Sequence, residues 1–90
     1  MKLCLDEKKV RDLLFEKKVS VTGFAREMEV SPAEVYQKFK GTSGVSIKQL
    51  NKLCIYFKRG EEDILTEQSL IDLDDYRNDM EYLDTLNAQY

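Results

Sequence analysis

The segment VSPAEVYQKFKG, residues 30–41, carries the signals that start and end a short helix. Ser31 can accept hydrogen bonds from the free amides of the first turn, Pro32 suits the first helical position, and Glu34 completes an S-x-x-E capping box. Gly41 suits the position where such a helix ends. Val35 and Phe39 are four residues apart and therefore share one face. We predict a helix over 32–40 that is buried along this face.

The remaining faces of this helix carry small, amide and basic side chains. Groups of this kind contact base edges and phosphates when a helix lies in a groove of DNA. The leading hypothesis is therefore that the helix binds DNA in a sequence-specific way. The residues concerned are Ala33, Tyr36, Gln37, Lys38 and Lys40.

Two more helices are predicted before this segment from caps and apolar spacing. Asp6 can cap the first, which ends near residues 17–18, and Ser20 can cap the second, which ends before the turn at residues 29–30. No part of the chain has the alternation of a strand, so the fold class is all-α. The residues expected to be buried are Val10, Leu13, Leu14, Phe24, Ala25 and Met28.

Two further helices are predicted after a loop at 41–45. Ser46 and Gln49 form an S-x-x-Q capping box that opens the fourth helix, and Gly60 breaks it. A fifth helix is expected to begin at 61–65, with acidic residues in its first turn, where the helix dipole favours them. The buried stripe expected for the fourth helix is Ile47, Leu50, Leu53, Cys54 and Phe57.

The composition limits the kinds of site that the chain can hold. Ninety residues with 42% hydrophobic content allow one domain with a modest core. No apolar run approaches the roughly 20 residues of a membrane span, and no signal peptide is visible, so we expect a cytosolic protein without membrane contact. With two cysteines, Cys4 and Cys54, and no histidine, one chain cannot supply four zinc ligands. No cofactor is predicted, and the absence of a nucleophile with a neighbouring base argues against an enzyme.

Charge is divided unevenly along the chain. Residues 1–65 carry 13 Lys and Arg against 10 Asp and Glu, a net charge of +3, whereas residues 66–90 carry one Arg against seven acids, a net charge of −6. Positive potential of this kind attracts nucleic acid, so the first region is the one expected to meet DNA. Residues 36–60 contain basic side chains and no acidic one.

The second and third helices resemble those of the lambda-repressor/Cro-type, or XRE-like, helix-turn-helix family. The resemblance covers residues 5–65 and implies a five-helix DNA-binding domain. Three places depart from the family pattern: Glu29 replaces the usual glycine of the turn, Val21 a common phosphate-binding glutamine, and 32–34 polar base-reading residues. The resemblance rests on Ser20, Ala25, Met28, Val30, Ser31, Val35, Phe39, Gly41, and the segments 46–50 and 62–65.

The resemblance also implies which residues contact DNA, since the first half of the third helix enters the major groove in this family. Ala33 and Gln37 are the predicted base readers, Ala33 against a thymine methyl and Gln37 against adenine. Glu34 could accept from cytosine or serve only in the capping box, and Tyr36 could bind a phosphate or lie idle on the surface. The residues predicted to contact the DNA backbone are Ser20, Tyr36, Lys38, Lys40, Thr42, Ser43 and Lys48.

Residues 66–90 form a separate acidic tail in this interpretation, with 1–65 as the DNA-binding domain. Apolar residues recur there in steps of three and four, which predicts an additional C-terminal amphipathic helix. Its stripe could pack on its own domain, on a second copy or on another protein, and an exposed Phe15 could be the surface where it docks. The predicted dimer or partner contacts are Phe15, Leu70, Leu73, Tyr76, Met80 and Leu83.

Two functions of different classes follow from these features. The first is a small repressor of the phage or mobile-element kind, which binds a palindromic operator as a homodimer. The alternative is a protein-binding module, such as an antitoxin, an antirepressor or a phage inhibitor of a host protein, which uses the acidic tail or the helix-turn-helix face. The basic residues within 36–60 favour DNA, whereas the net charge of −3 favours a protein partner.

Overall fold

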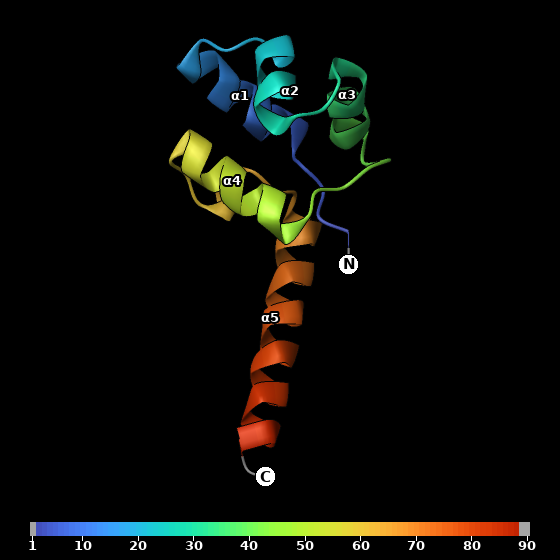
Figure 1. Ribbon diagram of the computed structural model, residues 1–90, viewed down its shortest axis with the longest axis vertical. Helices are drawn as coiled ribbons and strands as arrows, with labels where there is room; N and C mark the ends of the chain where they lie inside the picture. Colours follow the sequence, from blue (N-terminus) through green and yellow to red (C-terminus); the bar gives the residue numbers. More distant parts are fainter. Residues whose placement is uncertain (1, 89–90) are drawn as a thin grey trace.

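The computed structural model describes residues 2–88, with side chains described through residue 79. Four short helices form a rounded body, and a fifth, longer helix projects from it (Figure 1). The molecule measures 51 × 25 × 22 Å along its principal axes. The elements are α1 (Glu7–Lys17), α2 (Val21–Met28), α3 (Pro32–Lys40), α4 (Ile47–Phe57), the 3-10 turn η1 (Glu61–Asp63) and α5 (Glu67–Ala88). The predicted all-α fold class is confirmed.

The first four helices begin where the capping residues predict. Asp6, Ser20, Ser31 and Ser46 each accept a hydrogen bond from the backbone amide three residues further on. The capping box of α4 is complete, since Ser46 N donates to Gln49 Oε1 at 2.9 Å and Gln49 N donates to Ser46 Oγ at 3.1 Å. These caps satisfy amides that the helices themselves leave without acceptors.

Helix α3 packs on the core through the two apolar residues that were predicted to share one face. Val35 is fully buried and Phe39 is 9% exposed. The rings of Phe24 and Phe57 lie with their centroids 5.7 Å apart, and this contact packs α2 against α4. Burial of each such side chain contributes about 1.5–3 kcal/mol. The expectation for Ile47 was wrong, because this first residue of α4 lies at the surface with 36% of its area exposed.

An extended N-terminal segment completes the core, and the sequence interpretation did not foresee it. Leu3 forms an isolated antiparallel bridge with Val45, and Leu5 forms one with Leu65. Both leucines are almost fully buried, at 1% and 2% exposure. Asp6 N donates to Ile64 O at 2.9 Å, so the segment is bound on both sides by backbone hydrogen bonds. It therefore joins the loop after α3 to the start of α5.

The fifth helix expected at 61–65 was wrong, because only the single turn η1 forms there. Ile64 and Leu65 are both fully buried, and Leu65 is paired with Leu5 in the bridge. A continuing helix would occupy the Ile64 carbonyl, which instead accepts from Asp6 N of the N-terminal segment. The additional helix predicted for the tail is therefore the fifth α-helix of the chain.

The first turns of α5 belong to the core of the body. Ser69 is buried and accepts a hydrogen bond from Cys4 N at 2.8 Å, and Leu73 is 1% exposed. Leu73 was therefore wrongly assigned to a dimer or partner contact. Beyond this point α5 leads away from α1 (Figure 1), so the described part of α5 does not cover Phe15, which is 86% exposed.

Each of the helices α1 to α4 is followed by a residue in the left-handed conformation, and in three of the four cases this residue is not glycine. These residues are Lys18, Glu29 and Lys58, with φ of 59°, 61° and 54°, and Gly41 takes the same role after α3. A side chain with a Cβ is strained at positive φ, whereas glycine is not. The missing glycine of the turn between α2 and α3 thus leaves the geometry intact but costs stability.

Replacing Glu29 with glycine should therefore raise the free energy of unfolding by about 1 kcal/mol, because the left-handed strain disappears. Urea unfolding followed by circular dichroism measures this change. The matched control is Lys52→Gly in the middle of α4, which should lower the free energy of unfolding by about 1 kcal/mol. Equal destabilisation by both substitutions would contradict the strain at Glu29.

Candidate nucleic-acid interface

Helix α3 lies at the edge of the body, where one of its faces meets α2 and another is open to solvent (Figure 1). Val35 and Phe39 anchor the inner face, so the outer face is presented on a rigid helix. The residues predicted to read bases, Ala33, Glu34 and Gln37, are all exposed. The structure therefore brings these three residues together in the first half and middle of one exposed helix.

Glu34 has only half of the predicted capping box. Its backbone amide donates to Ser31 Oγ at 3.2 Å, but among the described residues its carboxylate makes no return bond to the backbone of Ser31. The side chain is exposed. Of the two roles considered for Glu34, the structure leaves its carboxylate available as an acceptor.

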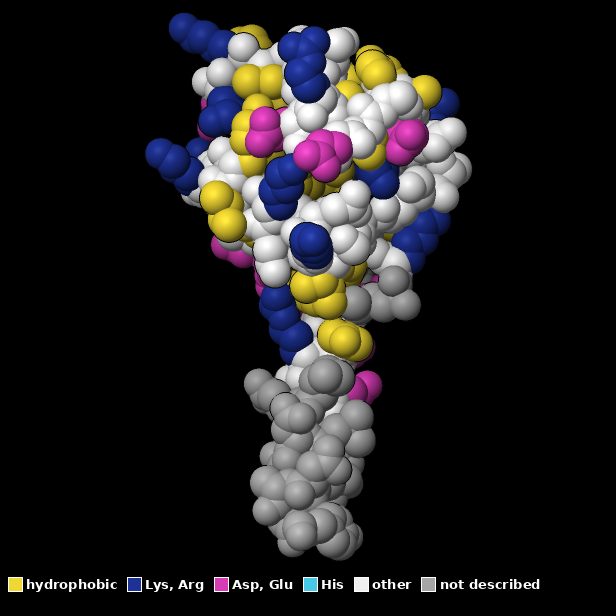
Figure 2. All heavy atoms as spheres, in the orientation of Figure 1, with side chains coloured by type: hydrophobic (Ala, Val, Ile, Leu, Met, Phe, Trp, Pro, Cys, Tyr) yellow, Lys and Arg dark blue, Asp and Glu magenta, His cyan; other side chains and the backbone are white. Residues whose placement is uncertain are grey.

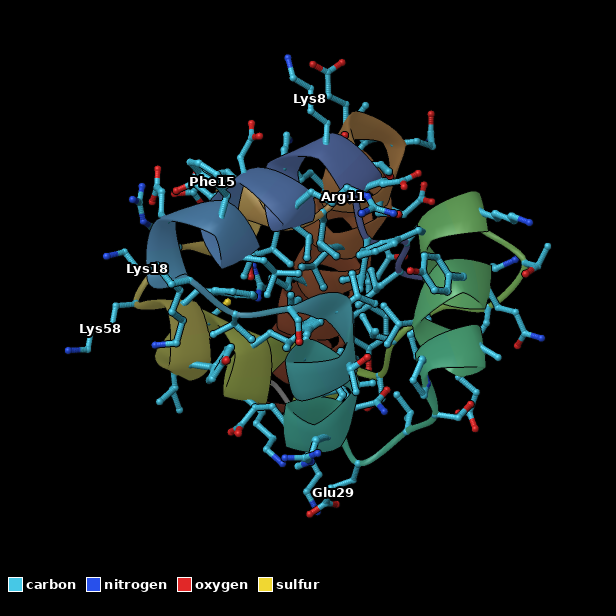
Figure 3. The ribbon with its side chains drawn as sticks, turned by 90° about the horizontal axis from the view of Figure 1, so that it is seen from above. Lys8, Arg11, Phe15, Lys18, Glu29 and Lys58 are labelled. Carbon is cyan, nitrogen blue, oxygen red and sulfur yellow. The ribbon has the colours of Figure 1, made fainter. Side chains whose placement is uncertain are left out.

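Tyr36 lies on the side of α3 that faces α1. The guanidinium carbon of Arg11 is 5.9 Å from the centroid of the Tyr36 ring and 5.2 Å from that of Phe39. Arg11 is held from the other side by Glu7, whose carboxylate accepts from Arg11 Nε at 2.8 Å and raises the pKa of the guanidinium. This contribution of Arg11 was not predicted, although the spacing of Glu7 and Arg11 is that of a helical ion pair. Figure 3 shows Arg11 directed from α1 toward α3.

Lys38 is placed differently from its prediction as a phosphate contact. Its side chain is buried, with only 6% of the residue exposed. The ammonium donates to Ser43 Oγ at 3.2 Å and to Gly44 O at 2.9 Å. Because these bonds turn the ammonium toward the loop that follows α3, Lys38 does not extend to solvent as a phosphate-binding lysine would.

Thr42 also differs from its prediction as a phosphate donor. Its Oγ1 donates to Gln37 O at 3.0 Å, and since a carbonyl has no hydrogen to give, the hydroxyl hydrogen lies on this bond. Only lone pairs remain on the outer side of Thr42, and these repel a phosphate oxygen. The hydroxyl of Thr42 therefore closes α3 rather than binding the DNA backbone.

The other predicted backbone contacts keep a polar group for a ligand. Lys40 and Lys48 are exposed on either side of the loop at 41–46, and Ser43 is half-buried within it. Ser20 accepts from Gly23 N at 3.1 Å as the cap of α2, which leaves its hydroxyl hydrogen free to donate. These four residues remain the predicted contacts to phosphate.

Positive charge is not gathered on a single face. Figure 2 shows Lys and Arg side chains spread over the visible face of the body, with Asp and Glu between them. Lys18 and Lys58 lie together on the side away from α3 (Figure 3). Arg59 is engaged with Glu16, since its Nη2 lies 3.0 Å from Glu16 Oε2. The lysines that can serve the α3 face are therefore few.

Clusters of metal ligands and free cysteines are the other groups that could form a chemical site. No group of three or more potential metal ligands occurs among them. Cys4 and Cys54 are free, and burial, together with Glu61 and Glu62, raises the pKa of the Cys54 thiol. A raised pKa keeps the less nucleophilic thiol form at neutral pH. In the part of the chain that the structure describes, no helix is both long and apolar enough to cross a membrane.

Helix α5 presents a partly apolar surface outside the body. Ile71 is 54% exposed and Tyr76 is 41% exposed, whereas Leu70 is packed against the core. Arg77 forms a two-pronged pair with Glu61 of η1, which fixes the middle of α5 to the body. Ile71 was absent from the predicted stripe, and the side chains of Met80 and Leu83 lie outside the described residues.

Comparison with known proteins gives one informative result. A family model described as a Cro/C1-type HTH DNA-binding domain matches residues 9–68. No curated protein and no solved structure gives a significant match. The matched range begins in the first turn of α1, includes α3 and the loop that follows it, and ends in the first turn of α5. The chain therefore belongs to the family of Cro/C1-type helix-turn-helix DNA-binding domains, and the resemblance inferred from its sequence is confirmed.

Proposed function

We propose that the protein is a sequence-specific transcription repressor that binds a palindromic operator as a homodimer, of the small kind found in phages and mobile elements. The observation that carries this proposal is the outer face of α3, where Ala33, Glu34 and Gln37 are exposed side by side in the chain's helix-turn-helix. Bound at a promoter, such a dimer would exclude the transcription machinery.

The chemistry of the three side chains suits direct reading of bases. A glutamine amide can donate to N7 of adenine and at the same time accept from its N6 amino group. A methyl group packs on the methyl group of thymine, and a carboxylate accepts from the amino group of cytosine. The first half of a recognition helix is the part that reaches base edges in the major groove. Gln37, Ala33 and Glu34 take these roles in the proposal.

A dimer supplies the length of site that one domain lacks. Two recognition helices related by a two-fold axis contact half-sites about 34 Å apart, one turn of DNA, so the second domain doubles the length of sequence that is read. The exposed Ile71 and Tyr76 of α5 lie on different sides of the helix and offer a second copy apolar contacts that do not overlap α3. We assign the dimer contact to these residues and to the distal part of α5.

Gln37→Ala should relax the preference at one operator position. The loss of a bidentate contact should cost about 1–3 kcal/mol on the cognate operator and almost nothing on scrambled DNA, because phosphate contacts are unchanged. Fluorescence anisotropy with both DNAs measures the difference. Equal weakening on cognate and scrambled DNA would remove Gln37 from base reading.

Lys40→Ala should weaken binding to every sequence alike. Loss of one phosphate contact should reduce the slope of log affinity against log salt by about one. The control is Lys8→Ala, because Lys8 projects from α1 away from α3 (Figure 3). A slope that changes equally in both variants, or in neither, would contradict a phosphate contact at Lys40.

The double substitution Ile71→Gln, Tyr76→Gln should convert the dimer to a monomer, because it removes exposed apolar area and leaves the buried Leu73 in place. Light scattering after size exclusion measures the mass. Truncation after residue 66 is a poorer test, because Ser69 and Leu73 are parts of the core. Phe15→Gln is the matched control on α1 and should remain a dimer. Loss of the dimer in Phe15→Gln alone would place the contact on α1 instead.

A protein-binding module is the second candidate, and the acidic surface of α5 favours it. Asp74, Asp75 and Asp79 are exposed there and project from the body with the helix. If the full chain fails to bind DNA from its own upstream region at every salt concentration tested, this candidate is favoured over the repressor.

A further inference from the structure

Six large apolar side chains are exposed in the described part of the chain, and four of them lie on the two helices α4 and α5. Ile47 and Ile55 of α4 are 36% and 78% exposed, and Ile71 and Tyr76 of α5 are 54% and 41% exposed. Exposed apolar area that polar residues surround marks a contact surface. The charged residues around these four side chains indicate what each helix contacts.

The solvent-facing side of α4 is basic. Its residues recur in steps of three and four, so they share one side of the helix, and all of them are exposed. Helix α4 contains no acidic residue, and neither of its lysines forms an ion pair among the described residues. A groove against the end of α2 borders this side. The residues of this basic face of α4 are Lys48, Asn51, Lys52 and Ile55.

The solvent-facing side of α5 is acidic. Leu73 is buried in the body, so the opposite side of the helix faces away from it. Asp75 and Asp79 are exposed there, and around the helix they fall between Ile71 and Tyr76. Neither carboxylate forms an ion pair among the described residues, and the one basic residue of α5 is bound to η1. This acidic face of α5 consists of Ile71, Asp75, Tyr76 and Asp79.

We propose that these two faces form a reciprocal interface between two copies of the chain, in which the acidic face of α5 of each copy packs on the basic face of α4 of the other. The inference rests on the proposed function and names the surface that receives α5 in its homodimer. Lysine ammonium groups then lie next to carboxylates, and exposed apolar side chains of both helices are removed from water. Two-fold symmetry makes this contact twice in each dimer.

A second copy is the occupant because the two faces cannot meet within one chain. The buried Leu73 and the pair of Arg77 with Glu61 fix α5 to the body, from which it projects (Figure 1). The two faces have similar lengths, since residues 48–55 rise about 10 Å and residues 71–79 about 12 Å along their helices. One face can therefore lie along the whole of the other.

The interface leaves the predicted DNA contacts in place. It is centred on Lys52 and Ile55, in the second and third turns of α4. Lys48, in the first turn, borders the loop at 41–46 and keeps its predicted contact to phosphate. Helix α3 belongs to neither face. The carboxylates of α5 are then directed at lysines of the other copy instead of at DNA.

Two variants, each of which damages one face, test this pairing. Ile55→Asp places a carboxylate on α4 against the acidic face of α5, whereas Ile71→Gln, Tyr76→Gln removes the apolar contacts of α5. A loss of about tenfold in each of the two contacts should raise the dissociation constant of the Ile55→Asp dimer by about a hundredfold, as measured by sedimentation equilibrium. Phe15→Asp is the matched control on α1 and should dissociate like the wild type. Circular dichroism should show unchanged helix content in all three variants.

Mixing the two damaged variants gives the decisive readout. In a mixed dimer, one contact has both of its faces damaged, but the other joins the intact α4 of one variant to the intact α5 of the other. Each variant alone should therefore be monomeric at a concentration at which their equimolar mixture forms heterodimers. Light scattering after size exclusion measures the recovered mass.

The possible results separate this interface from the proposed function. A stable dimer of Ile55→Asp alone would overturn the proposal, because α5 would then contact a surface other than α4. A mixture that stays monomeric would also overturn it, and operator binding by the wild-type dimer would retain the repressor in both cases. A monomeric wild type would overturn the interface together with the homodimer and leave both faces to another protein. Heterodimers of a protein that binds no operator would retain the interface and overturn the repressor.

Discussion

Backbone pairing of the N-terminal segment holds together the two parts of the chain on which function depends. Leu3 pairs with Val45 at the end of the loop after α3, and Leu5 pairs with Leu65 just before α5. Because Leu3 and Leu5 are also buried, the N-terminal segment completes the core and at the same time fixes the loop after α3 and the start of α5. These are contacts between residues far apart in sequence, so their entropic cost is met only when the whole body folds. The geometry of the α3 face and the direction of α5 are thus properties of the complete domain.

Hydrogen bonds within the chain decide which polar side chains remain for DNA. Lys38 and Thr42 look like surface residues in the sequence, yet Lys38 Nζ donates to Ser43 and Gly44 of the loop, and the Thr42 hydroxyl donates to Gln37 of α3. Glu34, by contrast, was expected in a capping box and keeps its carboxylate free. The distinction rests on single bonds that residue type does not reveal. It removes Lys38 and Thr42 from the predicted backbone contacts and leaves Ser20, Lys40, Ser43 and Lys48.

Local signals explain how much of this fold could be predicted. The caps at Asp6, Ser20, Ser31 and Ser46 act on neighbouring amides, so four helices and most of their buried residues could be located from sequence. The N-terminal bridges, the single turn η1 and the burial of Leu73 depend on tertiary contacts, and these were missed. For the site, the exposure of Ala33 and Gln37 followed from helical periodicity, whereas the inward path of Lys38 required the loop to be in place. Arg11 was missed because its target is on another helix.

Projection of α5 reconciles an acidic chain with a DNA-binding body. A helix of 22 residues rises about 33 Å, whereas charges are screened over about 8 Å at physiological ionic strength. The last acidic residue of α5, Asp84, is about 16 Å along the helix from the buried Leu73, or about two screening lengths, so the more distant acids act only weakly on the body. Had the helix folded back along α3, the same residues would have repelled phosphate directly. The net charge of −3 consequently describes the whole chain but not the surface that meets DNA. The relevant value for that surface is the net charge of +3 of residues 1–65.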